Sequence, residues 1–79
     1  MADLKQVLTH IAGSIVDDPE SVIVVSDESD GLITLELTVA PGDMGKVIGR
    51  QGRIAKEIRV LVKAAAVKKG QKVVVEIVD

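Results

Sequence analysis

The amino-acid sequence predicts an α+β fold in which helices pack on one face of a three-stranded sheet, in the order α-β-β-α-α-β. Two segments repeat apolar residues at spacings of three and four, which is the period of an amphipathic helix. Three shorter segments are rich in Val, Ile and Leu and have the length and pattern of strands. Pro and Gly separate most of these segments and mark the boundaries between them.

The length and composition favour one small domain over residues 1–79. Its core must be aliphatic, because 14 Val, 8 Ile and 6 Leu supply most of the hydrophobic 47% and Phe, Tyr and Trp are absent. The chain has no Cys, no signal peptide and no apolar run near the roughly 18 residues that a membrane span needs. We therefore expect a soluble, cytoplasmic protein without disulfides.

The first half of the chain predicts one helix and two strands. The helix begins near Asp3 and ends before Pro19. A continuous β-branched run at 22–25 predicts a buried strand, followed by an acidic turn over 26–31. Residues 33–39 alternate between apolar and polar side chains, which predicts a half-buried strand antiparallel to the first. The helical face is formed by Leu4, Val7, Leu8, Ile11, Ala12 and Ile15.

A short helix is expected next, after a break at Pro41 and Gly42. Asp43 can act as its N-cap by accepting backbone N–H bonds, and the helix runs through Ile48. Residues 49–52 then interrupt the helical pattern.

The remaining segment predicts a long helix and a third strand. The helix runs from Arg53 to about Lys69, with Gly70 just beyond its C-terminal end. Residues 73–78 are apolar on both sides, which favours a strand that is central or covered. The predicted buried face of the helix consists of Ile54, Ile58, Leu61, Val62 and Ala65.

Charge is distributed unevenly along the chain. Residues 1–40 carry eight acidic residues and one Lys, whereas residues 41–79 carry nine basic and four acidic residues. A polyanion can therefore bind the second half of the chain, and the first half repels it.

The segment Val47-Ile48-Gly49-Arg50-Gln51-Gly52-Arg53 lies between the two helices of the second half and has the chemistry of a phosphate site. Glycine at both ends allows a sharp turn and a close approach by a ligand. The first N–H groups of the following helix are unpaired donors at the positive end of its dipole. Arginines within the segment, and Lys46 and Lys56 within one turn of it, add positive charge.

This segment resembles the signature of KH domains, and the element order is similar to the type II, bacterial form of that fold. Residues 41–66 resemble the KhpA family of small bacterial single-domain RNA-binding proteins. The resemblance implies that the G-x-x-G loop grips the backbone of short single-stranded RNA while the bases lie in an apolar groove, without aromatic residues. The RNA-binding residues that it implies are Lys46, Val47, Ile48, Gly49, Arg50, Gln51, Gly52, Arg53 and Lys56.

Within that set, the resemblance gives the residues different roles. Gly49 and Gly52 shape the loop, Val47 and Ile48 wall the groove, and Lys46 and Lys56 flank the site; the phosphate contacts are Arg50, Gln51 and Arg53. One position departs from the family pattern. Many KH domains place a branched aliphatic residue three positions after the second glycine, where this chain has Ala55. Ile54, one position earlier, is either a core residue or part of a protein interface.

A second apolar strip, Val60, Ala64 and Val67, faces away from the predicted buried face of the long helix. It is either covered by the sheet or a helix-to-helix dimer surface. The resemblance implies a homodimer, and also pairing with a larger multi-domain KH protein. Two functions follow: an RNA-binding protein acting as an RNA chaperone or post-transcriptional regulator, or a dimerising adaptor whose RNA contact is incidental.

Other functional classes are disfavoured by the residues present. His10 is the only His and has no nucleophile beside it, so we expect no enzyme activity. The acidic groups at 17–20 and 27–30 do not have the spacing of a calcium loop, so no metal or cofactor is expected. RNA-recognition sheets that stack bases on aromatic residues are also excluded.

Overall fold

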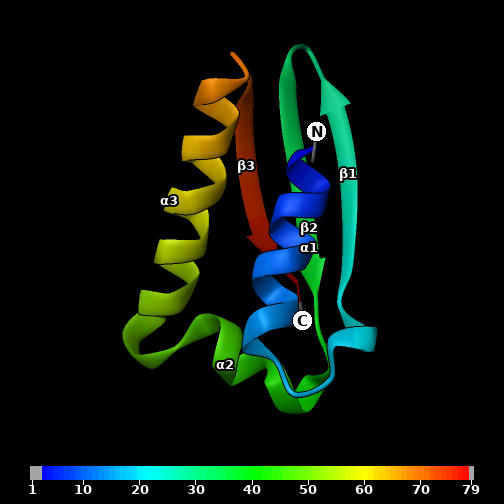
Figure 1. The fold of residues 1–79 in the computed structure, drawn as a ribbon, viewed down its shortest axis with the longest axis vertical. Coiled ribbons are helices and arrows are strands. Elements are labelled where there is room, and N and C mark those ends of the chain that lie inside the picture. The colour runs from blue at the N-terminus through cyan, green and yellow to red at the C-terminus, as the bar shows by residue number, and fades with distance from the viewer. Residues whose placement is uncertain (1–2, 79) are drawn as a thin grey trace.

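The computed structural model describes residues 3–78, which form a three-stranded sheet covered by helices (Figure 1). The predicted order α-β-β-α-α-β is confirmed. Short 3-10 turns precede β1, α2 and α3. The elements are α1 (Leu4–Ile15), β1 (Ile23–Ser29), β2 (Leu32–Thr38), α2 (Met44–Ile48), α3 (Arg53–Lys68) and β3 (Lys72–Ile77).

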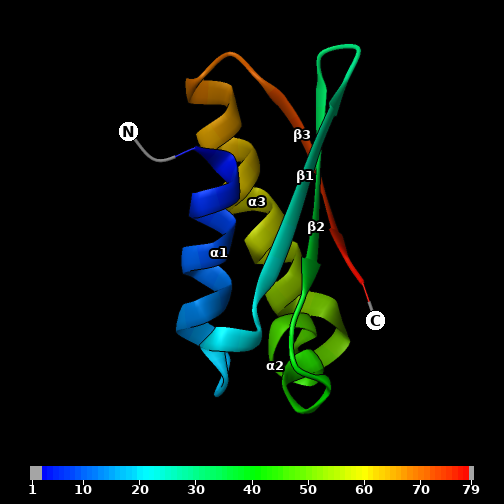
Figure 2. The ribbon, with the colours of Figure 1, turned by 90° about the vertical axis from the view of Figure 1, so that its right-hand side faces the viewer.

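The sheet is mixed, in the order β1-β2-β3. β1 runs antiparallel to β2, and β3 runs parallel to it. The two long helices, α1 and α3, lie on one face of the sheet, and α2 lies beyond the end of β2, as Figure 2 shows. The predicted α+β architecture is thereby confirmed, and the long α3 provides the crossover that a parallel pair requires.

The core lies between β2 and the two long helices. The alternation of β2 places Ile33, Leu35 and Leu37 on the inner face, where each is at most 8% exposed. Val24 of β1 and Val75 of β3 flank this row in the sheet. The helices contribute Leu4, Leu8 and Ala12 from α1 and Ile58, Val62 and Ala66 from α3. Among residues 3–78, no helix is long and apolar enough to cross a membrane.

The first strand differs from the prediction in length and in burial. It continues through Ser29, and only Asp30 and Gly31 form the turn, both with positive φ as in a type I′ hairpin. Asp27 and Glu28 therefore lie on the strand ladder, where they pair with Thr34 and Ile33 of β2. The predicted burial of this strand is also wrong, since Ile23 and Val25 are 56% and 53% exposed.

The third strand is an edge strand, where the sequence predicted a central or covered one. β3 pairs only with β2, and Val74 on its outer face is 39% exposed. A continuous apolar run does not reveal whether one face or both are covered. α3 lies beside the strand on the inner face, and its Arg59 Nε donates a hydrogen bond to the Val75 carbonyl oxygen at 3.2 Å.

The buried face of α3 is rotated from the predicted one. Ala55, Ile58, Val62 and Ala66 are buried, whereas Leu61 is 54% exposed, so its predicted place in the core is wrong. Alanines at both ends of this face allow the helix to lie close to the sheet. The predicted C-terminal boundary is confirmed. The Gly70 N–H bonds to the Val67 carbonyl at 3.0 Å and the Gln71 N–H to the Ala66 carbonyl at 2.8 Å, the pattern of a Schellman motif.

Asp43 occupies the predicted N-cap position of α2, but its side chain makes no capping bond to that helix. Its two carboxylate oxygens instead accept the backbone N–H groups of Asp17, at 3.2 Å, and Asp18, at 3.1 Å. The side chain is buried, and Lys46 Nζ lies 3.7 Å from it. This carboxylate therefore ties the chain between α1 and β1 to the start of α2.

Protonation of Asp43 is disfavoured by these contacts. Burial acts to raise the pKa of its carboxyl, but the two backbone donors and Lys46 outweigh burial, so the pKa lies below the ordinary 3.8. A carboxyl whose folded pKa is depressed stabilises the fold above its unfolded pKa. That contribution is lost as the pH falls through the folded value.

We expect Asp43→Asn to lower the urea midpoint at pH 6, because an amide supplies only one acceptor oxygen for the two N–H donors. The difference from wild type should shrink as the pH falls below 3.8 and through the lower pKa of the folded carboxyl, where the wild-type side chain also loses its charge. Urea unfolding followed by circular dichroism at pH 6 and at about pH 2 measures both values. An equal difference at the two pH values would show that the charge of Asp43 does not stabilise the fold.

Candidate nucleic-acid interface

The loop between α2 and α3 has an unusual backbone path. Gly49 ends α2 with φ 74° and ψ 176°, and Gly52 precedes α3 with φ 76°. Between them, Gln51 occupies the left-handed region, with φ 57° and ψ 26°. The Gly52 N–H donates to the Gly49 carbonyl at 3.2 Å, which closes the turn. Three of the four loop residues thus have positive φ, and two of them are glycines.

The two glycines are required for different reasons. A Cβ at Gly49 would collide with the Ile54 side chain and lie 3.0 Å from the Ile54 backbone nitrogen. A Cβ at Gly52 would enter open space, so only the positive φ favours glycine there. Gly49 therefore allows Ile54 to pack against the loop.

Ile54 and Ala55, the first apolar residues after the loop, both face the core. Ile54 is half-buried and packs against the core, which supports its interpretation as a core residue. Ala55 is 5% exposed, so the position where KH domains carry a larger side chain also faces inward here. Ala55 therefore belongs to the same buried face of α3 as Ile58 and Val62, although its side chain is small.

The side chains around the loop are exposed and positively charged. Arg50, Gln51, Arg53 and Lys56 all project from the protein surface. Residues 44–56 contain no Asp or Glu. No side chain caps the start of α3, so its first backbone N–H groups lack a side-chain acceptor. The Arg53 N–H donates to the Arg50 carbonyl within the preceding turn, so it is the helix dipole and the basic side chains that act together on an anion at this place.

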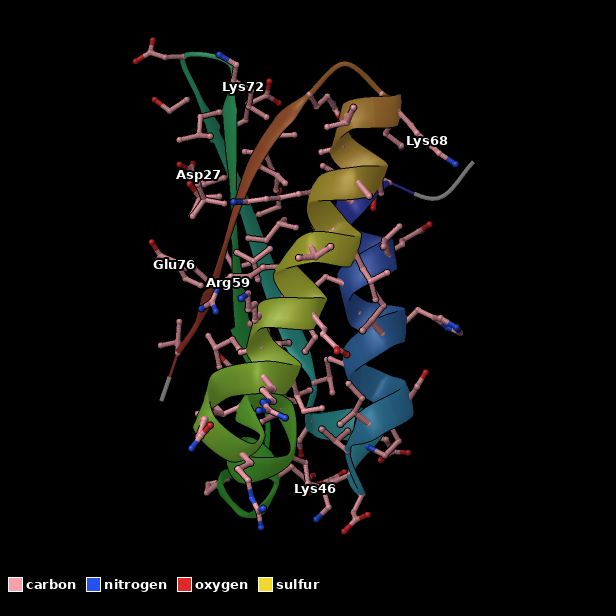
Figure 3. The ribbon with its side chains drawn as sticks, turned by 90° about the vertical axis from the view of Figure 1, so that its left-hand side faces the viewer. Asp27, Lys46, Arg59, Lys68, Lys72 and Glu76 are labelled. Atoms are coloured by element: carbon pink, nitrogen blue, oxygen red, sulfur yellow. The ribbon has the colours of Figure 1, made fainter. Side chains whose placement is uncertain are left out.

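Three of the predicted site residues have other surroundings. Val47 is fully buried, so it can support the loop only from beneath. Ile48 is 38% exposed and presents an apolar surface beside Gly49. Lys46 lies near the C-terminal end of α1 (Figure 3), where its Nζ is 3.1 Å from the Asp17 carboxylate. RNA contact by Lys46 stays a prediction, and it requires Lys46 to share or leave this ion pair.

The Lys46 ion pair also changes the titration of Lys46. The hydrogen bond to Asp17 is the main reason why the pKa of Lys46 lies above the ordinary 10.5. Lys46 therefore keeps its positive charge throughout the neutral range, whichever anion it contacts.

The outward strip of α3 is exposed, so it is not covered by the sheet. Val60 is 59% exposed and Val67 75% exposed, and Ala64 lies between them. Leu61, which the sequence assigned to the core, joins this surface. A shallow hollow on the same face is lined by Arg53, Lys56, Glu57, Val60 and Leu61. Of the two interpretations of this strip, the buried one is wrong.

Arg59 is a residue whose place the sequence did not reveal. It lies between α3 and β3 (Figure 3), half-buried, with its Nε on the Val75 carbonyl. In the sequence Arg59 is one of several basic residues after the loop, with Glu57 two positions before it. Its charge therefore gave no sign that its side chain bonds to β3. His10 is exposed, and residues 3–78 contain no group of three or more His, Asp or Glu that could hold a metal ion.

Comparison with known proteins identifies close relatives over nearly the whole chain. The KH domain of KhpA and KhpB matches residues 5–77. A protein of Clostridium acetobutylicum named RNA-binding protein KhpA is 59% identical over 95% of this chain and 100% of its own length. The RNA-binding protein KhpA of Bacillus subtilis is 46% identical over 96% of this chain and 94% of its own length.

Two solved structures share the fold at low sequence identity. Aquifex aeolicus Era with GDP and AlF4− superposes with a TM-score of 0.68 and 21% identity, covering 94% of this chain and 29% of Era. Era in complex with MgGDPNP and nucleotides 1506–1542 of 16S ribosomal RNA superposes with a TM-score of 0.69 and 21% identity, covering 94% of this chain and 28% of Era. This chain thus matches less than a third of Era, and the likeness concerns the fold of that part.

We expect Gly49→Ala to destabilise the protein more than Gly52→Ala does. Positive φ costs a non-glycine residue about 1–2 kcal/mol at either position, but only the Cβ at position 49 also collides with Ile54. Adding Ile54→Ala to Gly49→Ala should therefore cost less than the sum of the two single losses. Urea unfolding of the four variants by circular dichroism gives these values, and equal losses at both glycines with strict additivity would contradict the steric role.

Proposed function

Because this chain belongs to the KhpA/KhpB family of KH domains, we propose that it binds a short stretch of single-stranded RNA through the loop at 49–52 and the first turn of α3. In this proposal the exposed side chains of Arg50, Gln51 and Arg53 contact phosphates, and Lys56 flanks them. Ile48 offers an apolar surface to a base. Val47 supports the loop from the core.

One observation carries the proposal. The start of α3 has no side-chain cap and follows directly after the loop bounded by Gly49 and Gly52. The surrounding segment, residues 44–56, contains four basic residues and no carboxylate. An anion there meets backbone donors and side-chain cations at once. Residues 44–56 contain no aromatic side chain either, so affinity must come from the backbone of the RNA more than from stacking of its bases.

The same proposal covers the role and location of the protein. Membership of a family whose relatives are named RNA-binding proteins confirms the prediction that the chain is not an enzyme. We propose that it acts as an RNA chaperone or post-transcriptional regulator in the cytoplasm, as a single KH domain over residues 1–79. One such domain reaches only a few nucleotides, so broad selectivity is expected.

A homodimer through α3 is a second part of the proposal, and the alternative of a dimerising adaptor depends on it. The exposed strip formed by Val60, Leu61, Ala64 and Val67 favours it, because these side chains lie together on one face of a 16-residue helix. Single exposed apolar residues are ordinary, but a row of them on one helix favours a partner helix. The same strip is proposed to pair with a larger multi-domain KH protein.

We expect the double variant Arg50→Asp, Gln51→Asp to stay folded and to lose RNA affinity by about tenfold or more, since charged hydrogen bonds are removed and carboxylates repel phosphate. The matched control is Lys5→Asp, Gln6→Asp, which makes the same charge change at exposed positions of α1. Gel-shift titration with a single-stranded oligonucleotide and thermal melting decide the outcome. Equal losses in the two variants would mean that net charge, and not the loop, governs binding.

The salt dependence of wild-type binding provides a further measure in the same assay. Three or four phosphate contacts predict that log K falls against log salt with a slope of about −2 to −3. Perfect duplex should bind more weakly than single strand, because KH recognition needs splayed bases. A slope near zero, or equal affinity for duplex, would count against the proposed mode of binding.

We expect Val60→Asp, Val67→Asp to convert the proposed dimer into a folded monomer, because both side chains are exposed in the single chain but would be buried in the pair. Ile23→Asp is the matched control, since Ile23 is 56% exposed on a different face. Sedimentation equilibrium and circular dichroism distinguish the outcomes. A wild-type monomer at high concentration would contradict the dimer, and a double variant that still dimerises would place the interface elsewhere.

A further inference from the structure

The outer edge of β1 is an open strand edge. β1 pairs with β2 on one side, and no other strand of the described chain pairs with the opposite side (Figure 1). Ile23 and Val25 project from the outer face of the sheet beside this edge, and both are more than half exposed. Such edges usually carry a charged side chain or a cover that blocks further pairing. On β3, the other edge strand, Arg59 covers the Val75 carbonyl; on β1, the stretch 22–26 has no charged residue.

This apolar stretch lies between two groups of acidic residues. Residues 17–30 include six acidic residues and no Lys or Arg. Three of them precede β1, and Asp17 among these is already paired with Lys46. The other three are at the hairpin end, where Asp27 points away from the helices (Figure 3).

The neighbouring strands add two carboxylates to the outer face, on which Lys72 of β3, opposite Leu32, also lies. Glu36 of β2 is directly opposite Val25, and Glu76 of β3 is directly opposite Glu36. Residues opposite each other in a sheet project to the same side, so these carboxylates lie in one row with the exposed valine. Figure 3 shows Glu76 on the same side as Asp27, away from α3.

This charge pattern limits what can occupy the edge. RNA is repelled, because its phosphates would meet carboxylates at both ends of the stretch. A second copy pairing edge to edge would place its own acidic residues against these, which like charges also disfavour. A segment with Lys or Arg on both sides of a short apolar centre matches the surface in charge and in hydrophobicity.

We propose that the outer edge of β1 binds an extended, basic segment of another protein, which adds a fourth strand to the sheet. Its backbone pairs with residues 23–29, and its alternate apolar side chains lie beside Ile23 and Val25. Its Lys or Arg side chains meet the acidic groups before and after that pair. This site lies on the sheet, away from the loop at 49–52, so it can be occupied while RNA is bound.

The experiment uses the full chain labelled with 15N and a blocked peptide of about nine residues, the length of an ordinary strand, with Lys at both ends and alternate Val residues in its centre. Amide shifts should concentrate at Ile23–Ser29. Val25→Lys should weaken binding by about tenfold or more, through loss of an apolar contact and added repulsion. The control Val74→Lys makes the same change on the outer face of β3 and should alter affinity by less than about twofold.

A second pair of peptides tests strand addition independently of any variant. N-methylation of alternate residues on one edge of the peptide removes the donors of that edge, while charge and composition stay the same. One of the two methylated peptides should lose binding to wild type and the other should keep it. Retained binding of both, equal losses in the two valine variants, or shifts concentrated on α3 would each overturn the proposal. It would also be overturned if single-stranded RNA shifted the β1 amides or if Val25→Lys split a dimer of the chain.

Discussion

The close approach of the Gly49 backbone to the Ile54 side chain fixes the turn between α2 and α3, and the proposed RNA interface depends on that turn. Ile54 packs against the core on one side and against the loop on the other. The opposite end of α2 is held by Asp43, which binds the chain leading from α1 into β1. The loop is thus supported from two directions by buried groups, although its own side chains are exposed. Such support allows the first turn of α3 to keep one orientation without a ligand.

Opposite charges occupy different faces of this small molecule. The basic residues around the loop lie at the start of α3, and the acidic residues follow β1 and the outer face of the sheet. The loop between α2 and α3 lies at the opposite end of the molecule from the β1–β2 turn (Figure 2). The nearly balanced net charge of −2 therefore conceals two surfaces that attract different partners. The proposed RNA ligand is attracted to one surface, and the proposed basic segment is attracted to the other.

Periodicity in the sequence was sufficient to predict the element order, the inner face of β2 and the limits of α3. It was insufficient where tertiary contacts decide. The apolar residues of α3 form one possible stripe with Leu61 and Ala65 and another with Ala55 and Ala66, so only packing selects which of the two faces is buried. Asp is a residue type that commonly caps helices, but the carboxylate of Asp43 instead accepts hydrogen bonds from the chain that follows α1. The loop residues could be predicted from the sequence because two glycines with arginines beside them form a local pattern that is typical of a phosphate site. The open edge of β1 could not, because it depends on the strand order of the sheet.

The parallel pairing of β2 with β3 also has a consequence for the newly synthesised chain. The β1–β2 hairpin joins neighbouring residues and can form as soon as both strands have left the ribosome, since local contacts cost little chain entropy. The β2–β3 ladder joins residues as far apart as Leu32 and Lys72, and α2, the loop and α3 all lie inside that connection. A nascent chain that stops before Lys72 therefore contains the complete G-x-x-G sequence but lacks the strand against which α3 is held. The proposed recognition of RNA by this loop therefore requires that β3 has been synthesised, and a chain that stops earlier presents basic residues without a defined geometry.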